Sequence, residues 1–513
     1  MHSIATHELT PKAISTMLPQ TRLQVYNGLD CCLTLEVFEE MSRTFNRAPD
    51  IYSFERAMQA PYLEIMLRGF RIDRIARDQA ARSLRERIEK LQRTLNRLAI
   101  AVWDKPLNPS SYKQLQEFFY GRMKLPEVWL NQKGERKLST NREALEKLEV
   151  YLHARPIIAC ILTIRDLAKQ LQVFETEIDN DSRFRTSYNV AGTTTGRPSS
   201  SENAFGTGGN AQNIAPGLRF VFVADPGYKL VNIDLEQVEA RDVGFICGCL
   251  FDDWTFLDAC ESGDLHTNNA RLIWPELPWT TDPGQNRKIA DSQFYREFSY
   301  RDMAKRGGHL SNYVGTAFTA SRHLKVPQAI MEEFQARYCR GRPANRTKGL
   351  PAITPAYSCI AQYWQWVATE LQTVQQLTNL FGRRRHFFGR PNDDATLREA
   401  VAFLPQSTTA DRMNLGLWRV WKHMPQVQLL AQTYDSITFQ CREQQLDDCV
   451  AEALERIQVE LEAPNGRKYV VPGSAAVGWN WGYQGEANPD GLVKWRPGSD
   501  QRARTQLLDR IMV

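Results

Sequence analysis

The alternation of apolar and polar residues predicts strands that each lead to one isolated acid. Residues 229–233 alternate in this way, and Asp234 follows them directly. Residues 427–431 and 437–440 also have strand character, and the short polar break between them places Asp435 at the tip of a predicted hairpin. If these strands are neighbours in one sheet, the two carboxylates lie close together.

Two such carboxylates could hold two magnesium ions about 3.5–4 Å apart, one activating a hydroxyl and one stabilising the leaving oxygen of a phosphoryl transfer. Manganese is a possible substitute for magnesium. Taken singly, an Asp at a strand end or in a turn is more often a turn former or a cap. The metal hypothesis therefore depends on the segment between the two acids.

The segment 301–313 has a helical pattern with one polar side. Four side chains recur there at intervals of four residues: Arg301, Lys305, His309 and Tyr313. The two cations could neutralise the oxygens of a triphosphate, and the two rings could line the space for a base. A solvated basic helix face is the alternative. Gly307 and Gly308 count against that alternative, because each glycine costs about 1 kcal/mol in a helix interior.

With these segments in this order, the sequence resembles the family A DNA polymerases, the group of bacterial DNA polymerase I and many phage replicases. Residues 234–241 resemble motif A of the family, residues 301–313 the fingers helix of motif B, and residues 434–436 motif C. Further segments resemble the family's contacts to primer, template or triphosphate: residues 195–200, 212–214, 264–266, 382–385 and 405–411. The resemblance covers residues 50–485.

The resemblance implies a mixed α/β right hand with palm, fingers and thumb, in which an antiparallel palm sheet bears both acids. The implied divisions are 1–48 for the C-terminal remnant of an exonuclease domain, 49–190 for the lead into the palm and a helical thumb, 191–260 for the palm with motif A, 261–400 for the fingers, 401–485 for the palm with motif C, and 486–513 for a C-terminal extension. Residues 77–97 predict a long amphipathic helix with basic sides. That helix is interpreted as one arm of the thumb; a helix pair packed only for stability is the alternative.

Carried over position by position, the resemblance makes Asp234 and Asp435 the catalytic, metal-binding acids, with the backbone carbonyl of Leu235 completing a metal shell. Glu239 becomes a steric gate that fills the space of a ribose 2′-hydroxyl and so favours deoxynucleotides. The residues implied to bind nucleotide are Arg301, Lys305, His309, Tyr313, His266, Gln237 and Glu239. The residues implied to bind DNA are Arg197, Gln212, Asn213, Arg241, Arg398, Gln406 and Tyr434.

Three positions depart from the usual family pattern. Tyr434 stands where His is common and Ser436 where Glu is common, so proton handling around the second metal should differ. His309 stands where Phe or Tyr is usual, which leaves the response to dideoxynucleotides open. Residues 340–349 form an additional basic stretch with loop character, which either contacts DNA phosphate or is solvated.

The beginning of the sequence resembles the last motif of the family's 3′→5′ exonuclease, with Tyr26, Asp30 and a helical run over residues 33–41. The other exonuclease acids would lie more than a hundred residues upstream in the family, and no Asp-x-Glu precedes Asp30 here. We therefore expect no proofreading by this chain alone. The front half of the exonuclease fold is either a separate polypeptide that docks here or has been lost from a truncated gene.

Composition adds constraints on the partner and the compartment. The chain has 64 Lys and Arg against 59 Asp and Glu, a net charge of +5, so a DNA-binding groove must come from local clustering. No signal peptide and no uninterrupted apolar run of about eighteen residues is present, which predicts a cytoplasmic protein, in the host cytoplasm if viral. The ten cysteines form no CxxC pair, and buried reduced thiols are expected, Cys31 and Cys32 included.

The sequence thus predicts a DNA-directed DNA polymerase that extends a primer on a DNA template in replication. The expected partners are primer-template DNA, deoxynucleoside triphosphates and a possible separate exonuclease subunit, with no membrane. A single-subunit RNA polymerase is the first alternative, and Glu239 argues against it. An inactive DNA-binding or scaffold module is the second, and the presence of both acids argues against it. The tail, residues 477–482, resembles that of phage members and predicts a phage origin.

Overall fold

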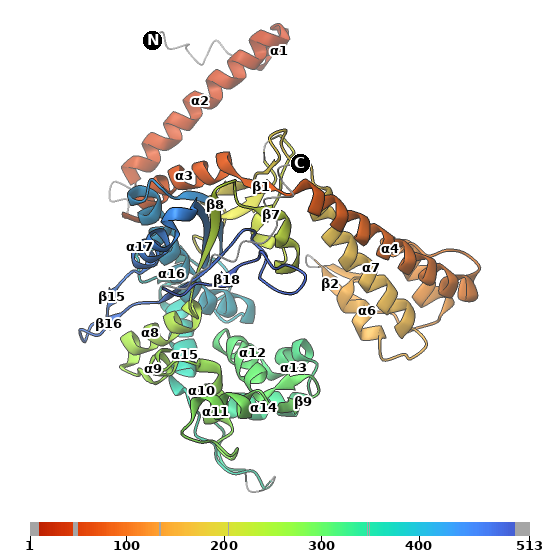
Figure 1. Cartoon of the computed structure of the whole chain (residues 1–513), viewed down its shortest axis with the longest axis vertical. Coiled ribbons are helices and arrows are strands. Elements are labelled where there is room, and N and C mark those ends of the chain that lie inside the picture. Colours follow the sequence, from red (N-terminus) through yellow and green to blue (C-terminus); the bar gives the residue numbers. More distant parts are fainter. Residues whose placement is uncertain are drawn as a thin grey trace.

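The palm sheet occupies the centre of the molecule (Figure 1) and has five antiparallel strands in the order β13-β14-β8-β17-β18. Their bounds are Gln428–Thr433 for β13, Ser436–Arg442 for β14, Tyr228–Leu235 for β8, Gly473–Gly478 for β17 and Val493–Lys494 for β18. The structure is a computed structural model that describes residues 10–44, 50–132, 135–203, 205–345, 347 and 349–497. The expected mixed α/β fold with an antiparallel palm sheet is confirmed.

This sheet shares one apolar core with α3 (Asp50–Arg68), α8 (Val238–Phe251), α16 (Asp394–His423) and α17 (Leu446–Ile457). A buried ion pair ties α16 to α8, because Arg412 donates to Asp242 at 2.9 Å and both side chains are fully buried. Thr409 and Tyr469 also donate to the Asp242 carboxylate, so its oxygens are satisfied inside the core. Since α16 runs unbroken through residue 400, the expected division between fingers and palm falls inside one helix.

The thumb is built on two long packed helices, α4 (Arg74–Trp103) and α7 (Arg155–Glu175). Asp73 caps α4 by accepting from the amide of Ala76 at 2.9 Å. Leu84 and Leu95 of the predicted apolar stripe are buried, so the long amphipathic helix is confirmed. The tip comprises α5 (Tyr112–Gln116), η2 (Glu117–Arg122), β2 (Trp129–Gln132), β3 (Glu135–Leu138) and α6 (Arg142–Leu148).

The fingers are a group of mostly short helices that share a second apolar core. They comprise α9 (Thr255–Glu261), α10 (Leu265–Ile273), α11 (Pro283–Ala290), β9 (Gln293–Tyr295), β10 (Phe298–Ser299), α12 (Tyr300–Asn312), α13 (Ala317–Leu324), α14 (Gln328–Gln335), η5 (Ala336–Arg340) and α15 (Ser358–Thr373). Within the basic stretch, Arg342 pairs with Glu333 at 2.6 Å, and Asn345 forms a backbone bridge with Leu350. Arg346 and Lys348 lie outside the described residues, so contact with DNA phosphate and solvation both remain possible for this stretch.

Short elements join these parts. They are β1 (Phe70–Ile72), β4 (Arg183–Phe184), β5 (Ser187–Asn189), β6 (Ser199–Ser201), η3 (Ala211–Asn213), η4 (Pro216–Val221), β7 (Phe222–Val223), β11 (Gln376–Thr378), β12 (Arg384–His386), η7 (Glu443–Gln445), β15 (Leu461–Glu462) and β16 (Lys468–Tyr469). Strand β18 pairs with β17, so the segment expected to be a C-terminal extension contributes the last strand of the palm sheet. None of the described helices is long and apolar enough to span a bilayer.

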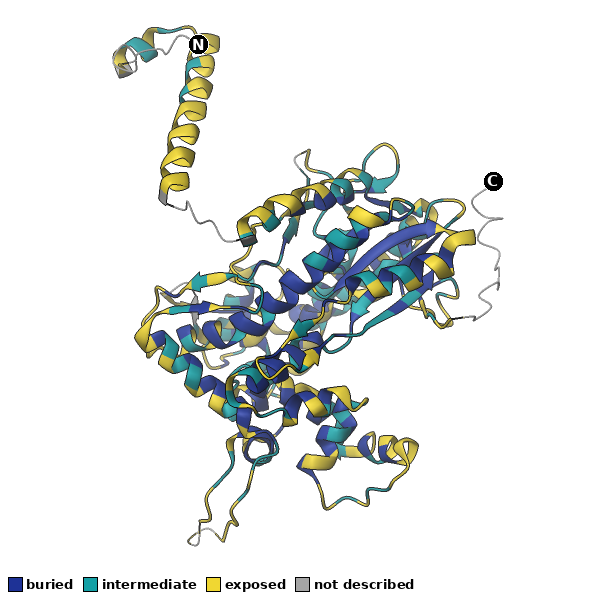
Figure 2. Cartoon of the chain, turned by 90° about the vertical axis from the view of Figure 1, so that its left-hand side faces the viewer, coloured by how far each residue is buried: buried dark blue, intermediate teal, exposed yellow. Residues whose placement is uncertain are grey.

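Helix α2 (Pro19–Thr44), preceded by α1 (Pro11–Thr16), projects away from the palm (Figures 1 and 2). Tyr26 and Asp30 are both exposed on it. Cys31 and Cys32 are exposed as well, so the expectation of buried thiols is wrong for this pair. The reason is tertiary, because the apolar residues around the two thiols lack a covering element among the described residues.

Candidate active site

The two predicted acids meet at one end of the palm sheet. Asp234 is the residue before the last in β8, and it is paired in register with Ser436 of β14. The amide of Leu235 donates to the carbonyl of Asp435 at 3.0 Å. Tyr434 adopts a positive φ of 54°, as a two-residue turn between β13 and β14 requires. The hairpin predicted around Asp435 is therefore confirmed, and it places Asp435 beside the end of β8.

The electrostatics of this corner favour a cation. Burial, together with the negative charges of Asp435 and Glu236, raises the pKa of Asp234 to about 7. Burial also raises the pKa of Asp435, with a contribution from Glu239 that Arg197 opposes. No described Lys, Arg or His forms an ion pair with Asp234 or Asp435. Two hard oxygen donors without a counter-ion suit magnesium or manganese, so the donor set fits the metal implied by the resemblance.

Two residues expected to contact DNA, Gln212 and Asn213, form hydrogen bonds with residues next to Asp435. Gln212 is buried, and its amide donates to the backbone carbonyl of Gln432 at 3.4 Å and to that of Pro198 at 3.2 Å. Its side chain is therefore engaged within the protein. Asn213 is exposed and accepts a hydrogen bond from the Tyr434 hydroxyl at 2.9 Å. Of these two residues, Asn213 is the one whose position leaves it open to a ligand.

Glu239 is held in place from two sides. The Tyr313 hydroxyl donates to its carboxylate at 2.6 Å, and Arg197 forms an ion pair with its other oxygen. Arg197 also lies over the ring of Tyr434, 5.8 Å from the centroid. Residues from four separate predicted segments thus converge near Asp435, and the carboxylate expected to act as a steric gate is fixed in orientation.

Helix α12 reaches the site through Tyr313 at its C-terminal end, and its predicted basic side chains lie nearer its beginning. A capping box of Ser299 and Asp302 sets its first turn. Arg301 is half-buried and bonds Asp264 at 2.9 Å, whereas Lys305 is exposed. Burial opposes ionisation of Asp264, but hydrogen bonds from Arg301 and Thr267 hold its pKa below the usual range. The ring of His309 meets that of Tyr313 edge to face, with centroids 5.2 Å apart.

Gly307 and Gly308 of α12 are both buried. A Cβ on Gly307 would lie 2.8 Å from the ring of Phe334, and one on Gly308 would lie 3.1 Å from the hydroxyl of Tyr338. Both glycines are therefore explained by the close packing of α12 on α14 and η5. By themselves they do not identify a phosphate-binding face.

Comparison with known proteins decides the family. The sequence model of DNA polymerase family A matches residues 77–482. The chain belongs to DNA polymerase family A. It is 26% identical over 432 residues to the thermostable DNA polymerase I of Thermus caldophilus, covering 78% of this chain and 46% of that protein. It is 24% identical over 492 residues to DNA polymerase I of Chloroflexus aurantiacus, covering 90% of this chain and 47% of that protein.

A solved structure supports the same fold. The polymerase domain of Pol1 from M. smegmatis, in complex with DNA primer-template and dNTP, superposes with a TM-score of 0.65 at 19% identity, covering 83% of this chain and 70% of that one. The chain spans about half the length of the bacterial DNA polymerase I proteins that it matches.

In this family A polymerase, His266 of α10 lies in a half-buried position with its Nδ1 unpartnered among the described residues. Burial and the charges of Arg301 and Lys305 lower its pKa to about 4. The imidazole is therefore neutral at pH 7 in the free protein. Because its folded pKa lies below its unfolded value of about 6.5, its contribution to stability is present above that value and is lost as pH falls toward 4.

We predict that pyrophosphate raises the pKa of His266, because an anion that neutralises Arg301 and Lys305 removes the repulsion against the imidazolium. The measurement is an NMR titration of the imidazole protons with and without pyrophosphate, assigned with His266→Gln. The resonances of His153, in the thumb, are the control and should not respond. A His266 titration that is unchanged by pyrophosphate would contradict the placement of phosphate beside α12.

Four other residues expected to bind DNA or nucleotide differ in how far they are buried. Arg241 is buried, and its Nε lacks a partner among the described residues. Gln237 adopts a positive φ of 55° directly before α8 and has a buried, unpartnered Oε1. Arg398 is exposed near the start of α16, and Gln406 is half-buried further along it. Among the described residues, none of these four side chains forms a hydrogen bond or an ion pair with Asp234 or Asp435.

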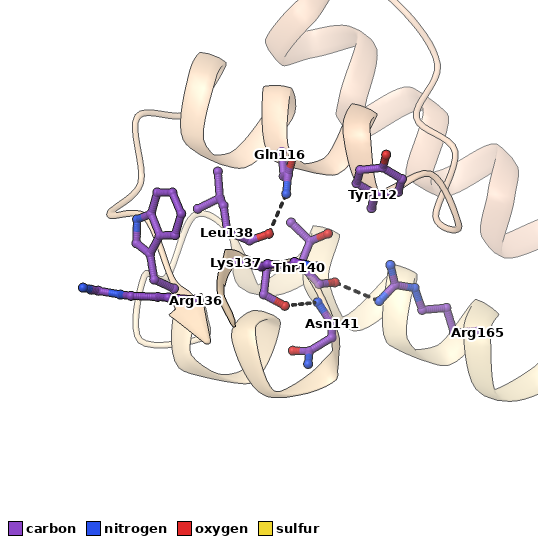
Figure 3. A pocket seen from close by; sticks show the side chains of 10 residues that line it. Tyr112, Gln116, Arg136, Lys137, Leu138, Thr140, Asn141 and Arg165 are labelled. Carbon is purple, nitrogen blue, oxygen red and sulfur yellow. Dashed lines mark hydrogen bonds between the residues drawn. The ribbon is translucent and has the colours of Figure 1, made fainter. Parts of the chain in front are cut away.

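The polymerase also has a hollow of about 740 Å³ at the tip of the thumb (Figure 3), lined by none of the predicted site residues. Exposed Tyr112 and Trp129 border it, together with Arg136. In Figure 3 the Gln116 amide donates to the Leu138 carbonyl at 2.7 Å and Arg165 to the Thr140 carbonyl at 3.1 Å, so these polar groups are already satisfied. The hollow lies in a different part of the fold from Asp234 and Asp435.

Sequence reasoning missed two acids of the site. The resemblance marked residues 264–266 for their His, but the pairing of Asp264 with Arg301 and Arg287 appears only in the folded chain. Glu236 was not singled out, although it stands two residues after Asp234. The available signal was the period of two along a strand, which places both acids on one face.

Proposed function

We propose that this chain is a DNA-directed DNA polymerase that adds deoxynucleotides to the 3′ end of a primer on a DNA template. The observation that carries the proposal is the juxtaposition of Asp234 and Asp435, across neighbouring strands of a family A palm, without a counter-ion in the part of the chain that the structure describes. The M. smegmatis relative with the same fold is in complex with DNA primer-template and dNTP, which supports the same two partners here.

Each group has a role in the proposed reaction. Asp234, Asp435 and the carbonyl of Leu235 would hold two magnesium ions, or manganese in their place, and the ions would supply charge stabilisation for the phosphoryl transfer. Arg301 and Lys305 bind the oxygens of the triphosphate, and neutral His266 lies beside them. Held by Tyr313 and Arg197, Glu239 excludes a nucleotide that carries a 2′-hydroxyl.

The test is extension of an end-labelled DNA primer on a longer template with magnesium, run in parallel with deoxynucleotides, ribonucleotides and no nucleotide. Extension with deoxynucleotides alone is expected. Extension with ribonucleotides at a similar rate would favour the RNA polymerase alternative, and no extension under any condition would favour a scaffold. Shortening of the primer without nucleotides would contradict the proposed lack of proofreading. A role in replication and a phage origin belong to the same proposal; the relatives compared are bacterial.

A further part of the proposal concerns α2. Its exposed apolar side chains include Leu23, Tyr26, Leu33, Val37 and Phe38, and their spacing places these five on one side of the helix. A helix with an apolar side normally packs that side against another element. We assign it to the end of an exonuclease fold whose remainder lies on the same polypeptide or on a separate subunit.

The exonuclease assignment is tested with Val37→Glu/Phe38→Glu in the chain as it occurs in its native source. A 3′→5′ exonuclease activity that copurifies with the unmutated polymerase and is lost from the variant is expected, with primer extension unchanged. Retention of the exonuclease by the variant, or its absence from the unmutated protein, would contradict the assignment.

A further inference from the structure

Glu236 stands on the same face of the palm sheet as Asp234. The ladder of β8 continues one residue beyond Leu235, because the amide of Glu236 donates to the carbonyl of Pro472 at 2.9 Å. Alternate residues of a strand point to one face, so the side chains of Asp234 and Glu236 lie on the same side. Glu236 is half-buried, as Asp234 is. The two carboxylates are thus close in space as well as in sequence.

No cation balances this third acid. Within the described residues, Glu236 forms no ion pair and its carboxylate accepts no hydrogen bond. Three carboxylates, those of Asp234, Glu236 and Asp435, therefore lie at one partly buried corner of the palm sheet. Half-buried carboxylates without partners are costly, and a bound cation is what removes that cost.

The residue opposite Asp234 offers little to such a cation. Ser436 pairs with Asp234 in register, but its hydroxyl is bonded to the side chain of Thr433 at 2.6 Å and to the Thr433 carbonyl at 3.1 Å. Its oxygen is therefore turned into the hairpin. Any additional anionic group near the metal must come from elsewhere, and Glu236 is the neighbouring acid that the sheet places on the correct face.

We propose that Glu236 is a positioning residue of the metal site, which holds water ligands of the ion bound by Asp234 and Asp435. The described residues contain no group of three His, Cys, Asp or Glu side chains arranged to bind one metal directly. Magnesium retains several waters in protein sites, and residues that hold such ligands affect metal affinity by about 10-fold to 100-fold. The inference depends on the proposed polymerase function only through the presence of the metal.

The test is manganese binding to the protein with a dideoxy-terminated primer-template, measured by calorimetry so that no chemistry is required. We expect Glu236→Gln to weaken the manganese Kd about 10-fold. The matched control is Glu462→Gln, which removes one exposed carboxylate from β15 and should leave the Kd unchanged. A Kd for Glu236→Gln equal to that of the unmutated protein would overturn the inference.

Moving the carboxylate tests the role of Glu236 even if the Glu236→Gln variant folds poorly. Glu236→Ser is compared with Glu236→Ser/Ser436→Glu, which moves the carboxylate to the neighbouring strand. Recovery of manganese affinity in the double variant is expected, and equal affinities in the two variants would overturn the role. If the unmutated protein binds manganese but extends no primer, the proposed function fails while the Kd difference still decides the inference about Glu236.

Discussion

Asp234→Asn and Asp435→Asn should each reduce the rate of primer extension about 1000-fold or more, while the Kd for primer-template DNA changes by less than about threefold. The reason is that each carboxylate contributes charge that holds a metal against the reacting phosphate, whereas neither lies in a basic surface that binds the duplex. Their neutral amide replacements preserve volume and leave the β8 and β14 ladder intact. Single-turnover extension and fluorescence anisotropy measure the two quantities separately.

The matched control is Asp448→Asn, which removes an exposed carboxylate from α17 on the same palm. It should extend primers at the unmutated rate. Comparable residual activity in Asp234→Asn, Asp435→Asn and this control would refute the catalytic assignment. A large loss of DNA affinity in the two site variants would instead indicate that the acids support the structure of the DNA-binding surface.

Glu239→Ala should raise the acceptance of ribonucleotides relative to deoxynucleotides about 100-fold, measured as the ratio of kcat/KM for single-nucleotide incorporation. The Glu239 carboxylate is fixed by the Tyr313 hydroxyl at 2.6 Å and by Arg197, so it cannot easily move aside for a 2′-hydroxyl. Removal of the side chain opens that space. Tyr313→Phe removes one of the two restraints and should give a smaller change in the same direction, about 10-fold.

Glu297→Ala serves as the control, since this exposed acid lies in the fingers between β9 and β10 and has no hydrogen bond or ion pair among the described residues. Its sugar selectivity should match that of the unmutated chain. Unchanged selectivity in Glu239→Ala would exclude the gate role and would reopen the RNA polymerase alternative, because the argument against it depends on this residue.

Local pattern was sufficient for the elements that carry the acids. The alternation before Asp234, the polar break at Asp435 and the spacing of cations along α12 all correspond to observed strands and a helix. The long thumb helix followed from its apolar stripe in the same way. Strand and helix periods are properties of neighbouring residues, so they can be read before any tertiary contact is known.

Reading single residues from local pattern was less successful. Gly307 and Gly308 are required by the close approach of the rings of Phe334 and Tyr338, which belong to other elements. Cys31 and Cys32 are exposed because α2 projects away from the palm. Gln212 was expected to contact DNA, but its side-chain amide donates hydrogen bonds to the backbone carbonyls of Pro198 and Gln432. In each case the outcome depends on which distant surface packs against the residue.

The sequence by itself determined the family resemblance, the two acids and the strands and helix that present them, because these depend on residue type and on short-range periodicity. Only the tertiary structure decided that Arg197 and Tyr313 hold Glu239 and that Asp264 pairs with Arg301. Such contacts join residues far apart in the chain. Their geometry is set by packing of the whole fold, which no local pattern encodes.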